Sequence, residues 1–298
     1  MDEIVVGVDG SPGGRAALRW AADEARARRA RLVVAHAYRL PPVLAGAASH
    51  PEAFEPELHR ASRELLEAEL ENASKHLSGL NVDSVLLSGQ GPGPALIETA
   101  SDAALLVVGA RGAGGFLGLR LGSVSEHCAR HASGDVVVVP ERRVEGVGQI
   151  VVGVDGSERA IAALGWAVDE ARLHELPVLA VSAYEPYPRD RPFGAEYMEA
   201  IAPGSARRLR AAAQRALEFS LESLEGVQDV KVEGAVIAGP PGQVLVEAAR
   251  EADLLVVGAR GRGGFEGLLL GYVSHQCLHH SSCATVVVRS PRRAFAEG

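Results

Sequence analysis

A seven-residue sequence, VVGVDGS, occurs twice in this chain of 298 residues, at Val5–Ser11 and again at Val151–Ser157. A second identity, LLVVGARG, occurs at Leu105–Gly112 and returns at Leu254–Gly261. Both pairs keep the same order and nearly the same separation, which chance cannot reasonably produce. The chain must therefore consist of two copies of one structural unit.

The length and composition fit two domains of ordinary size, which we place at residues 1–141 and 148–290. Hydrophobic residues make up 47% of the chain and charged residues 23%, which is typical of a soluble globular protein. The formal net charge is −8, and no concentrated basic stretch offsets it. We therefore expect no nucleic-acid partner.

The sequence also lacks the usual signals for export or membrane insertion. Its start, MDEIVVGVDG, has no basic segment followed by an apolar one, and no apolar run approaches the roughly 20 residues of a membrane span. The three cysteines, Cys128, Cys277 and Cys283, form neither a disulfide framework nor a CxxC pair. We expect a cytoplasmic protein without a membrane partner.

Within each copy, continuous apolar runs alternate with amphipathic helical segments. Strands are predicted at 3–8, 32–37, 82–87, 105–108 and 136–139, and again near 150–154, 178–183, 230–237, 254–257 and 285–288. Helices are predicted at 14–29, 55–77, from Pro94 onward, and at 123–131. Continuous apolar strands are covered on both faces. The expected fold is α/β: two tandem doubly wound domains, each a five-stranded, mainly parallel sheet with helices on both faces.

A glycine-rich segment follows the fourth strand of each copy. The first copy reads Gly109-Ala-Arg-Gly112, nine residues, then Gly122-Ser123, and the second has Gly258, Gly261, Gly271 and Tyr272 at the same spacing. Glycines let backbone N–H groups approach an anion, and a helix N-terminus favours phosphate. The segment could serve only as a turn. Its position after a parallel strand and its recurrence favour a phosphate site.

The glycine-rich segment is not a known nucleotide fingerprint of another class. A P-loop requires GxxxxGK[ST], and neither Lys75 nor Lys231 lies in one. GxGxxG is also absent. Phosphate charge must then be met by backbone amides, the helix end and either Arg111 or Arg260, although these arginines could equally be solvated loop residues.

The second signal is the GVDGS segment, Gly7–Ser11 in the first copy and Gly153–Ser157 in the second. Asp9 and Asp155 end the first strand of their copies, where a carboxylate could accept a ribose hydroxyl or hold a metal ion through water. The alternative is a helix cap. Because the serine of each segment suits the cap better, we expect it to leave the aspartate free for a ligand.

Other candidates are weaker. His275, His279 and Cys283 are spaced four apart and could ligate zinc if one helix ran that far. We expect Cys283 to lie past the helix end, so packing and capping are favoured and no metal site is assigned. His36 and His127 have no histidine counterparts in the second copy, and no nucleophile–base pair emerges. We therefore assign no catalytic residue.

Taken together, these motifs make the chain similar to tandem universal stress proteins over about residues 2–290. The resemblance is carried by VGVDGS, by the strand-two ends at 34–37 and 181–183, and above all by G-x2-G-x9-G-[S/T]. In that family the last pattern marks the branch that binds ATP.

The resemblance implies a role for each matched residue. Asp9 and Asp155 would contact the nucleoside or its metal ion, and the backbone near Ala37 and Ala183 would meet the adenine edge. The residues expected to wrap the phosphates are Gly109, Gly112, Gly122, Ser123, Val124 and Ser125 in the first copy and Gly258, Gly261, Gly271, Val273 and Ser274 in the second. Gly7 and Gly153 are assigned to the same two sites. The implied cofactor is ATP, with or without Mg²⁺.

One residue departs from the family pattern: its final Ser or Thr is Tyr272 in the second copy. A phenol cannot place its oxygen where Ser123 places a short hydroxyl. A hydrogen bond to a charged group contributes about 1.5–3 kcal/mol, which corresponds to roughly one to two decades in affinity. We expect one complete nucleotide site and one altered, weaker site.

The resulting hypothesis is a stress-response or signalling protein whose nucleotide occupancy tunes contacts with protein partners yet to be identified. The alternative is a slow nucleotide hydrolase or adenylyl-transfer enzyme, although the lack of a general base argues against vigorous turnover. A third alternative is a nucleotide-free scaffold. In the family, fifth strands often pair across a pseudo-twofold axis, so the resemblance also implies an intrachain pseudo-dimer or a homodimer.

Overall fold

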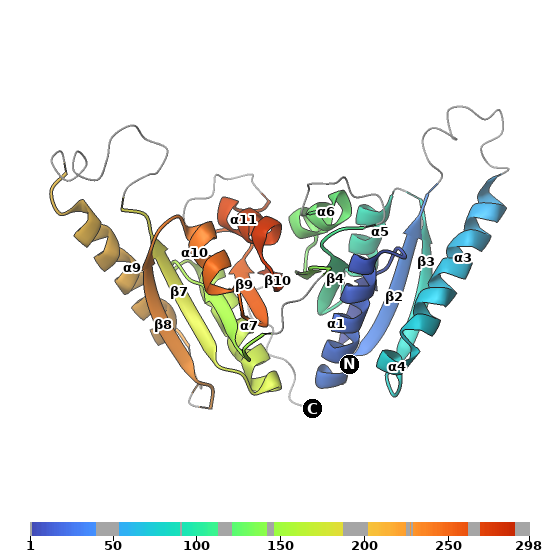
Figure 1. Ribbon diagram of the computed structural model, residues 1–298, viewed down its shortest axis with the longest axis horizontal. Coiled ribbons are helices and arrows are strands. Elements are labelled where there is room, and N and C mark those ends of the chain that lie inside the picture. The colour runs from blue at the N-terminus through green and yellow to red at the C-terminus, as the bar shows by residue number, and fades with distance from the viewer. Residues whose placement is uncertain are drawn as a thin grey trace. The chain divides into compact units, whose positions relative to one another are not determined.

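The computed structural model divides by its internal contacts into two units, Met1–Arg143 and Val144–Gly298 (Figure 1). It describes residues 2–39, 54–89, 91–112, 121–141, 146–186, 202–224, 227, 229–261 and 269–289. The nine-residue spacers of both glycine-rich segments fall largely outside this described part of the chain.

The two units repeat one order of strands and helices. The first contains β1 (Glu3–Gly7), α1 (Pro12–Arg28), β2 (Arg31–Tyr38), α3 (Glu55–Asn72), α4 (Ser74–Leu77), β3 (Val82–Ser88), α5 (Pro92–Thr99), β4 (Leu105–Gly109), α6 (Ser123–His131) and β5 (Asp135–Val139). The second contains β6 (Ile150–Gly153), α7 (Glu158–His174), β7 (Val178–Tyr184), α9 (Ser205–Glu222), β8 (Val232–Ala238), α10 (Pro241–Ala248), β9 (Leu254–Gly258), α11 (Tyr272–His280) and β10 (Ala284–Val288).

In both units the five strands are parallel, which confirms the predicted fold class. Their order is β3-β2-β1-β4-β5 in the first unit and β8-β7-β6-β9-β10 in the second. The chain moves outward from β1 to β3 and then returns to β4 and β5. Because parallel crossovers are right-handed, α1 and α3 lie on one face of the sheet and α5 and α6 on the other.

The core lies along the central strands. Ile4, Val5 and Val6 of β1 are fully buried, and the β4 and β5 valines are at most 3% exposed. The edge strand β3 differs, since its residues are only half-buried or exposed. A strand neighboured on both sides and covered on both faces has no solvated side chain, which is why the apolar runs of the inner strands are continuous.

Two helix boundaries differ from the predicted ones. The helix predicted over 55–77 is interrupted at Ala73, flanked by Asn72 and Ser74, whose short polar side chains compete with helical backbone hydrogen bonds. The helix predicted from Pro94 begins at Pro92. Its cap, Gly91, has φ of 114°, a conformation that favours glycine, and a proline suits the first position of a helix.

None of the described helices combines the length and the apolar character needed to cross a membrane.

Candidate functional site

A cavity of about 240 Å³ opens at the carboxyl ends of β1 and β4, where the strand order of the first unit reverses. In doubly wound sheets this reversal leaves a crevice suited to ligands. The sequence-predicted residues that line the cavity are Gly7, Asp9, Ala37, Gly109, Arg111, Gly112, Gly122, Ser123, Val124 and Ser125. The fold thus brings two motifs that are about 100 residues apart to one site.

The cavity also has an apolar wall that sequence reasoning missed. Val8, Ala35 and Val108 contribute to it from the strand ends, and Pro92 and Leu96 contribute from α5. The packing of α5 depends on Gly7, because a Cβ there would lie 2.8 Å from a methyl group of Leu96. The only sequence signal for this wall was the predicted doubly wound fold. In such a fold the helix that connects the third and fourth strands, here α5, passes over β1.

The first turn of α6 presents backbone donors to the cavity. Gly122 caps this helix, its own N–H donates to the Ala110 carbonyl at 2.7 Å, and its carbonyl accepts from the N–H of Glu126 at 2.9 Å. The N–H groups of Ser123, Val124 and Ser125 are the first of the helix and have no intrahelical acceptor. Free N–H groups at a helix N-terminus are the kind of donors that favour an anion.

The Ser125 side chain holds this turn in place. Its hydroxyl donates to the Gly109 carbonyl at 2.6 Å, and Ser274 makes the same bond to Gly258 at 2.7 Å in the second unit. Both serines are 3% exposed. A hydroxyl has one proton, so these side chains tie the helix to the preceding strand, and any donation by Ser125 or Ser274 to a phosphate would come from the backbone N–H.

The aspartate and the serine of each GVDGS segment form one hydrogen-bonded turn. Ser11 Oγ accepts from the N–H of Gly14 at 3.0 Å, and Ser157 Oγ caps α7 in the same way. The prediction that the serines cap these helices is confirmed. Ser11 also donates to Asp9 Oδ1 twice, through its hydroxyl at 2.5 Å and its N–H at 3.1 Å.

The aspartate is therefore not free of the capped turn, while its contact with a ligand stays a prediction. Asp155 Oδ1 accepts the same two bonds from Ser157, at 2.6 and 3.0 Å. An aspartate two residues before an N–H forms such a turn readily. One carboxylate oxygen is thus engaged, which orients the other. Asp9 Oδ2 lies against Gly112, where any Cβ would overlap it.

Glycines also let two backbone segments touch beside the first cavity. A Cβ on Gly109 would lie 2.5 Å from the carbonyl carbon of Gly13, and a Cβ on Gly13 would overlap the Arg111 carbonyl oxygen. No other residue type fits such an approach without a shift. The first turn of α1 therefore sits directly against the loop after β4.

Arg111 lines the cavity, while its guanidinium lies 3.4 Å from the Glu141 carboxylate. Both side chains are about 40% exposed, at 43% and 38%. An exposed pair of this kind contributes little to stability and is easily exchanged for another anion.

The second unit has a cavity of about 470 Å³ at the carboxyl ends of β6 and β9. Its sequence-predicted lining residues are Gly153, Asp155, Ala183, Gly258, Arg260, Gly261, Gly271, Val273 and Ser274. Tyr272 is the first residue of α11, lines the cavity and is 75% exposed. Gly271 caps α11 at φ −75° and ψ 158°, close to the φ −88° and ψ 161° of Gly122. The helix cap at the cavity therefore has the same backbone conformation in both units.

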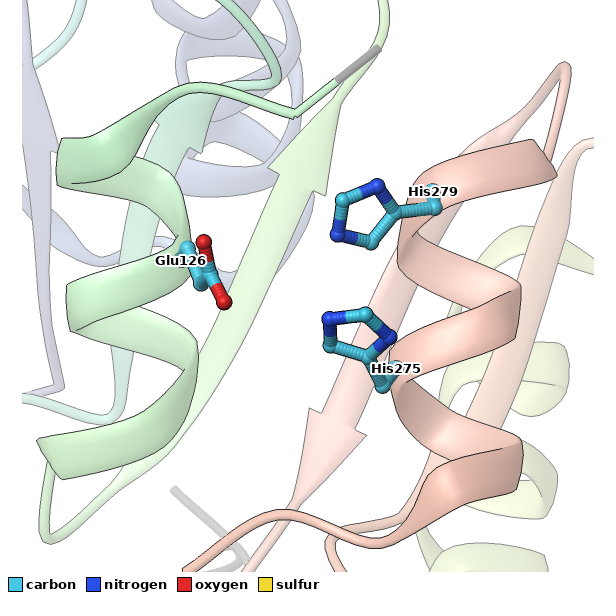
Figure 2. Close-up of side chains that lie close together, drawn as sticks. All are labelled: Glu126, His275 and His279. Carbon is cyan, nitrogen blue, oxygen red and sulfur yellow. The ribbon is translucent and has the colours of Figure 1, made fainter. Parts of the chain in front are cut away.

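The residues weighed as a zinc site do not assemble. Figure 2 shows His275 and His279 on one side of α11, where their ring centres are 4.3 Å apart. Cys283 lies beyond the helix end, as expected. The ligand atoms of these three residues, all within the described part of the chain, do not gather within 4.8 Å of one another. Glu126, also drawn in Figure 2, belongs to α6 of the first unit and pairs with Arg130 at 2.8 Å.

The other two cysteines are core residues. Cys128 and Cys277 are fully buried, and burial raises the pKa of each thiol to about 12. A thiol with such a pKa is protonated and unreactive at neutral pH.

Comparison with known proteins agrees with this architecture. The model of the universal stress protein family matches residues 1–140 and again residues 146–289. Two universal stress proteins of Mycobacterium tuberculosis are similar to the chain. One is 33% identical over 97% of this chain and 95% of its own length, and the other is 31% identical over 96% of each.

Solved structures resemble the whole chain. The crystal structure of a universal stress protein from Archaeoglobus fulgidus superposes with a TM-score of 0.69 at 19% identity, covering 96% of this chain and 98% of that one. A putative universal stress protein from Pseudomonas aeruginosa gives a TM-score of 0.58 at 17% identity, covering 97% and 93%. These two likenesses concern the fold alone. On the family match and the 33% identity over nearly the whole length, the chain belongs to the universal stress protein family, as a tandem of two of its domains.

Proposed function

We propose that this protein binds ATP in its two cavities and that nucleotide occupancy regulates contacts with protein partners in a stress response. One observation carries the proposal: an oriented aspartate, a glycine-bounded space and the N-terminal turn of a helix meet at the point where the strand order reverses. Each of these elements has a matching group on a nucleotide.

The chemistry of the first cavity fits an adenine nucleotide. The N–H groups of Ser123, Val124 and Ser125 would receive phosphate oxygens. The apolar wall of Val8, Ala35 and Leu96 would suit the flat face of a base. Asp9, whose carboxylate is already oriented by Ser11, would accept a ribose hydroxyl or hold Mg²⁺ through water. The glycines leave room that a Cβ would fill.

The second cavity has the same helix cap as the first, but one residue at its edge differs. It keeps Asp155 and the helix N-terminus, while Tyr272 replaces the short hydroxyl of Ser123. A phenolic oxygen stands several bonds farther from the backbone than a seryl oxygen. We propose that this site binds the same nucleotide more weakly, because one hydrogen bond to the phosphates is lost.

The side chains around the first cavity favour a binding function over an enzymatic one. Of the described residues that line it, Asp9 and Arg111 alone carry ionisable side chains. Hydrolysis would be aided by a general base within reach of the attacking water. Asp9 Oδ1 already accepts two hydrogen bonds from Ser11, so this oxygen is engaged in the capped turn and is not placed to take a proton from an attacking water.

Mass spectrometry of the supernatant from freshly purified, denatured protein tests the proposal. We expect ATP at about one equivalent or more, and less of it in the Asp9→Ala variant. Protein that carries no nucleotide, and that fails to bind ATP in calorimetry, would support a scaffold instead. Release of ADP over hours, abolished in Asp9→Asn, would support the slow hydrolase.

A further inference from the structure

The outer faces of α3 and α9, corresponding helices of the two units, carry the same spacing of residues with different charge. α3 and α9 each have 18 residues and cover the two outermost strands of their sheets (Figure 1). Buried positions match between them, Ser62 with Ala213 and Leu66 with Leu217. The exposed faces can therefore be compared position by position.

On α3 the exposed face carries an acidic stripe. It consists of Glu57, Ala61, Glu64, Ala68 and Glu71, all exposed. The steps along it are four, three, four and three residues, the spacing that keeps side chains on one line of a helix. Carboxylates alternate along it with small alanines. Within the described part of the chain, no ion pair engages these three glutamates.

On α9 the matching stripe is basic and aromatic. It consists of Arg208, Ala212, Arg215, Phe219 and Glu222, again all exposed. Phe219 is 54% exposed, which is unusual for so large an apolar side chain. Arg208 donates one hydrogen bond, to the Pro203 carbonyl at 2.9 Å, and a guanidinium has four further N–H donors.

From this complementarity we infer that α9 of one copy of the chain docks on α3 of a second copy. Both stripes follow the alternating three- and four-residue spacing of helices that pack side by side at a small crossing angle. A large side chain on one stripe, Phe219, meets a small residue on the other, Ala61. Arginines on one stripe meet glutamates on the other.

Antiparallel and parallel arrangements match the same number of positions, and the remaining pair of glutamates decides between them. The antiparallel arrangement sets Arg208 opposite Glu71, Arg215 opposite Glu64 and Phe219 opposite Ala61. The only like charges to meet are those of Glu222 and Glu57, and Arg60, exposed beside Glu57, offsets them. A parallel arrangement would instead bring Glu222 to Glu71, which has no arginine beside it on α3. Four turns of helix form a small interface, so the dissociation constant should be on the order of micromolar or weaker.

Sedimentation velocity on the full chain tests this contact. The wild-type protein should form larger species as its concentration rises, and 0.5 M salt should reduce them because the pairs are exposed. The double variant Arg208→Glu with Arg215→Glu, and the double variant Glu64→Arg with Glu71→Arg, should each lose this association. A mixture of the two should regain it, because each supplies the charge the other lacks.

Two further variants distinguish loss of this contact from loss of the folded structure. Arg207→Glu with Arg210→Glu makes the same change of charge on exposed positions of α9 that lie outside the stripe, and should associate like wild type. Phe219→Ser should weaken association about tenfold, as expected when a central aromatic contact is removed. Equal association of wild type and both charge-reversed variants would overturn the inference. So would a mixture that fails to recover, since it would indicate a contact within one chain.

Discussion

The two cavities share one backbone and differ in the side chains around it, which separates what the fold provides from what individual residues add. Capping glycines, aspartates and buried serines adopt the same conformations and the same hydrogen bonds in both units. At the rim, Ser123 is replaced by Tyr272. Beside it, Gly13 is replaced by Arg159 in the first turn of the helix.

These substitutions accompany the difference in volume, about 240 Å³ against about 470 Å³. A Cβ built on Gly109 would lie 2.6 Å from the carbonyl oxygen of Gly13, whereas one built on Gly258 would lie 2.9 Å from that of Arg159. Glycine at position 13 lets the strand-four loop close on the helix, and a larger residue holds it away. The first cavity is thus the tighter of the two enclosures.

The largest effect is expected for the two aspartate variants, each of which leaves one site to be measured alone. Asp155→Ala should leave the tighter site intact, and Asp9→Ala should leave only the weaker one, with a dissociation constant roughly tenfold to a hundredfold higher. The carboxylate and the turn it organises with the serine are both lost in each variant. Titration calorimetry with ATP measures the difference.

Asp102→Ala is the matched control for both aspartate variants, because Asp102 is exposed in the turn before β4, at the opposite end of that strand from the cavity. It should bind as wild type does. Thermal unfolding should be recorded alongside, since the capped turn also stabilises its helix. Equal affinities at the two surviving sites would contradict the proposed inequality.

A second prediction exchanges the rim residues. Tyr272→Ser should tighten the second site by about tenfold to a hundredfold, because a short hydroxyl can again reach a phosphate oxygen. Ser123→Tyr should weaken the first site by a similar factor. The measurement is calorimetry in an Asp9→Ala or Asp155→Ala background, respectively. Tyr272→Phe should change little, and weaker binding by that variant would show that the phenolic oxygen itself contacts the phosphates.

A third prediction concerns Gly13, where the first turn of α1 touches the loop after β4. Gly13→Ala places a Cβ where the Arg111 carbonyl oxygen lies and should force the loop outward. We expect a loss of about 1–3 kcal/mol in the free energy of unfolding, partly offset by up to about 1 kcal/mol of helix propensity. The affinity for ATP should fall by less than tenfold.

Urea unfolding and calorimetry follow the Gly13 variant. Gly134→Ala is its control, because a Cβ there would lie at an ordinary 3.6 Å from the nearest atom, the Ala103 carbonyl oxygen. Unchanged stability of Gly13→Ala would mean that the close approach does not hold the loop.

The smallest expected effect is none at all. Cys128 and Cys277 occupy matching core positions, and burial raises the pKa of both thiols to about 12. At pH 8 roughly one thiol in ten thousand would be ionised, and the thiolate is the reactive form. Labelling with a disulfide reagent should be slow and equal at the two positions, with full reaction only after unfolding. Fast labelling of one cysteine would show that the two units differ in their cores as well as at their cavities.

The repeated segments and the continuous apolar runs were enough to predict the duplication, the parallel sheets and most residues that line the cavities. Asp9 and Gly109 could be assigned to one site from the sequence because each ends a strand, and parallel strands end at the same edge of a sheet. The cap made by Ser11 was predictable for a similar reason, since it depends on residues only three apart.

Contacts between segments far apart in the sequence could not be predicted in this way. The closeness of Gly13 to Arg111, and of Gly7 to Leu96, depends on the distance between a helix and a strand, which a side chain of one more carbon would change. The carbonyl partner of Ser125, 16 residues earlier in the chain, was not predictable for the same reason. The amino-acid pattern by itself determined the duplicated fold and the location of its two cavities. Only the tertiary structure decided how closely each is enclosed, because the enclosure depends on differences of a few tenths of an ångström between packing distances.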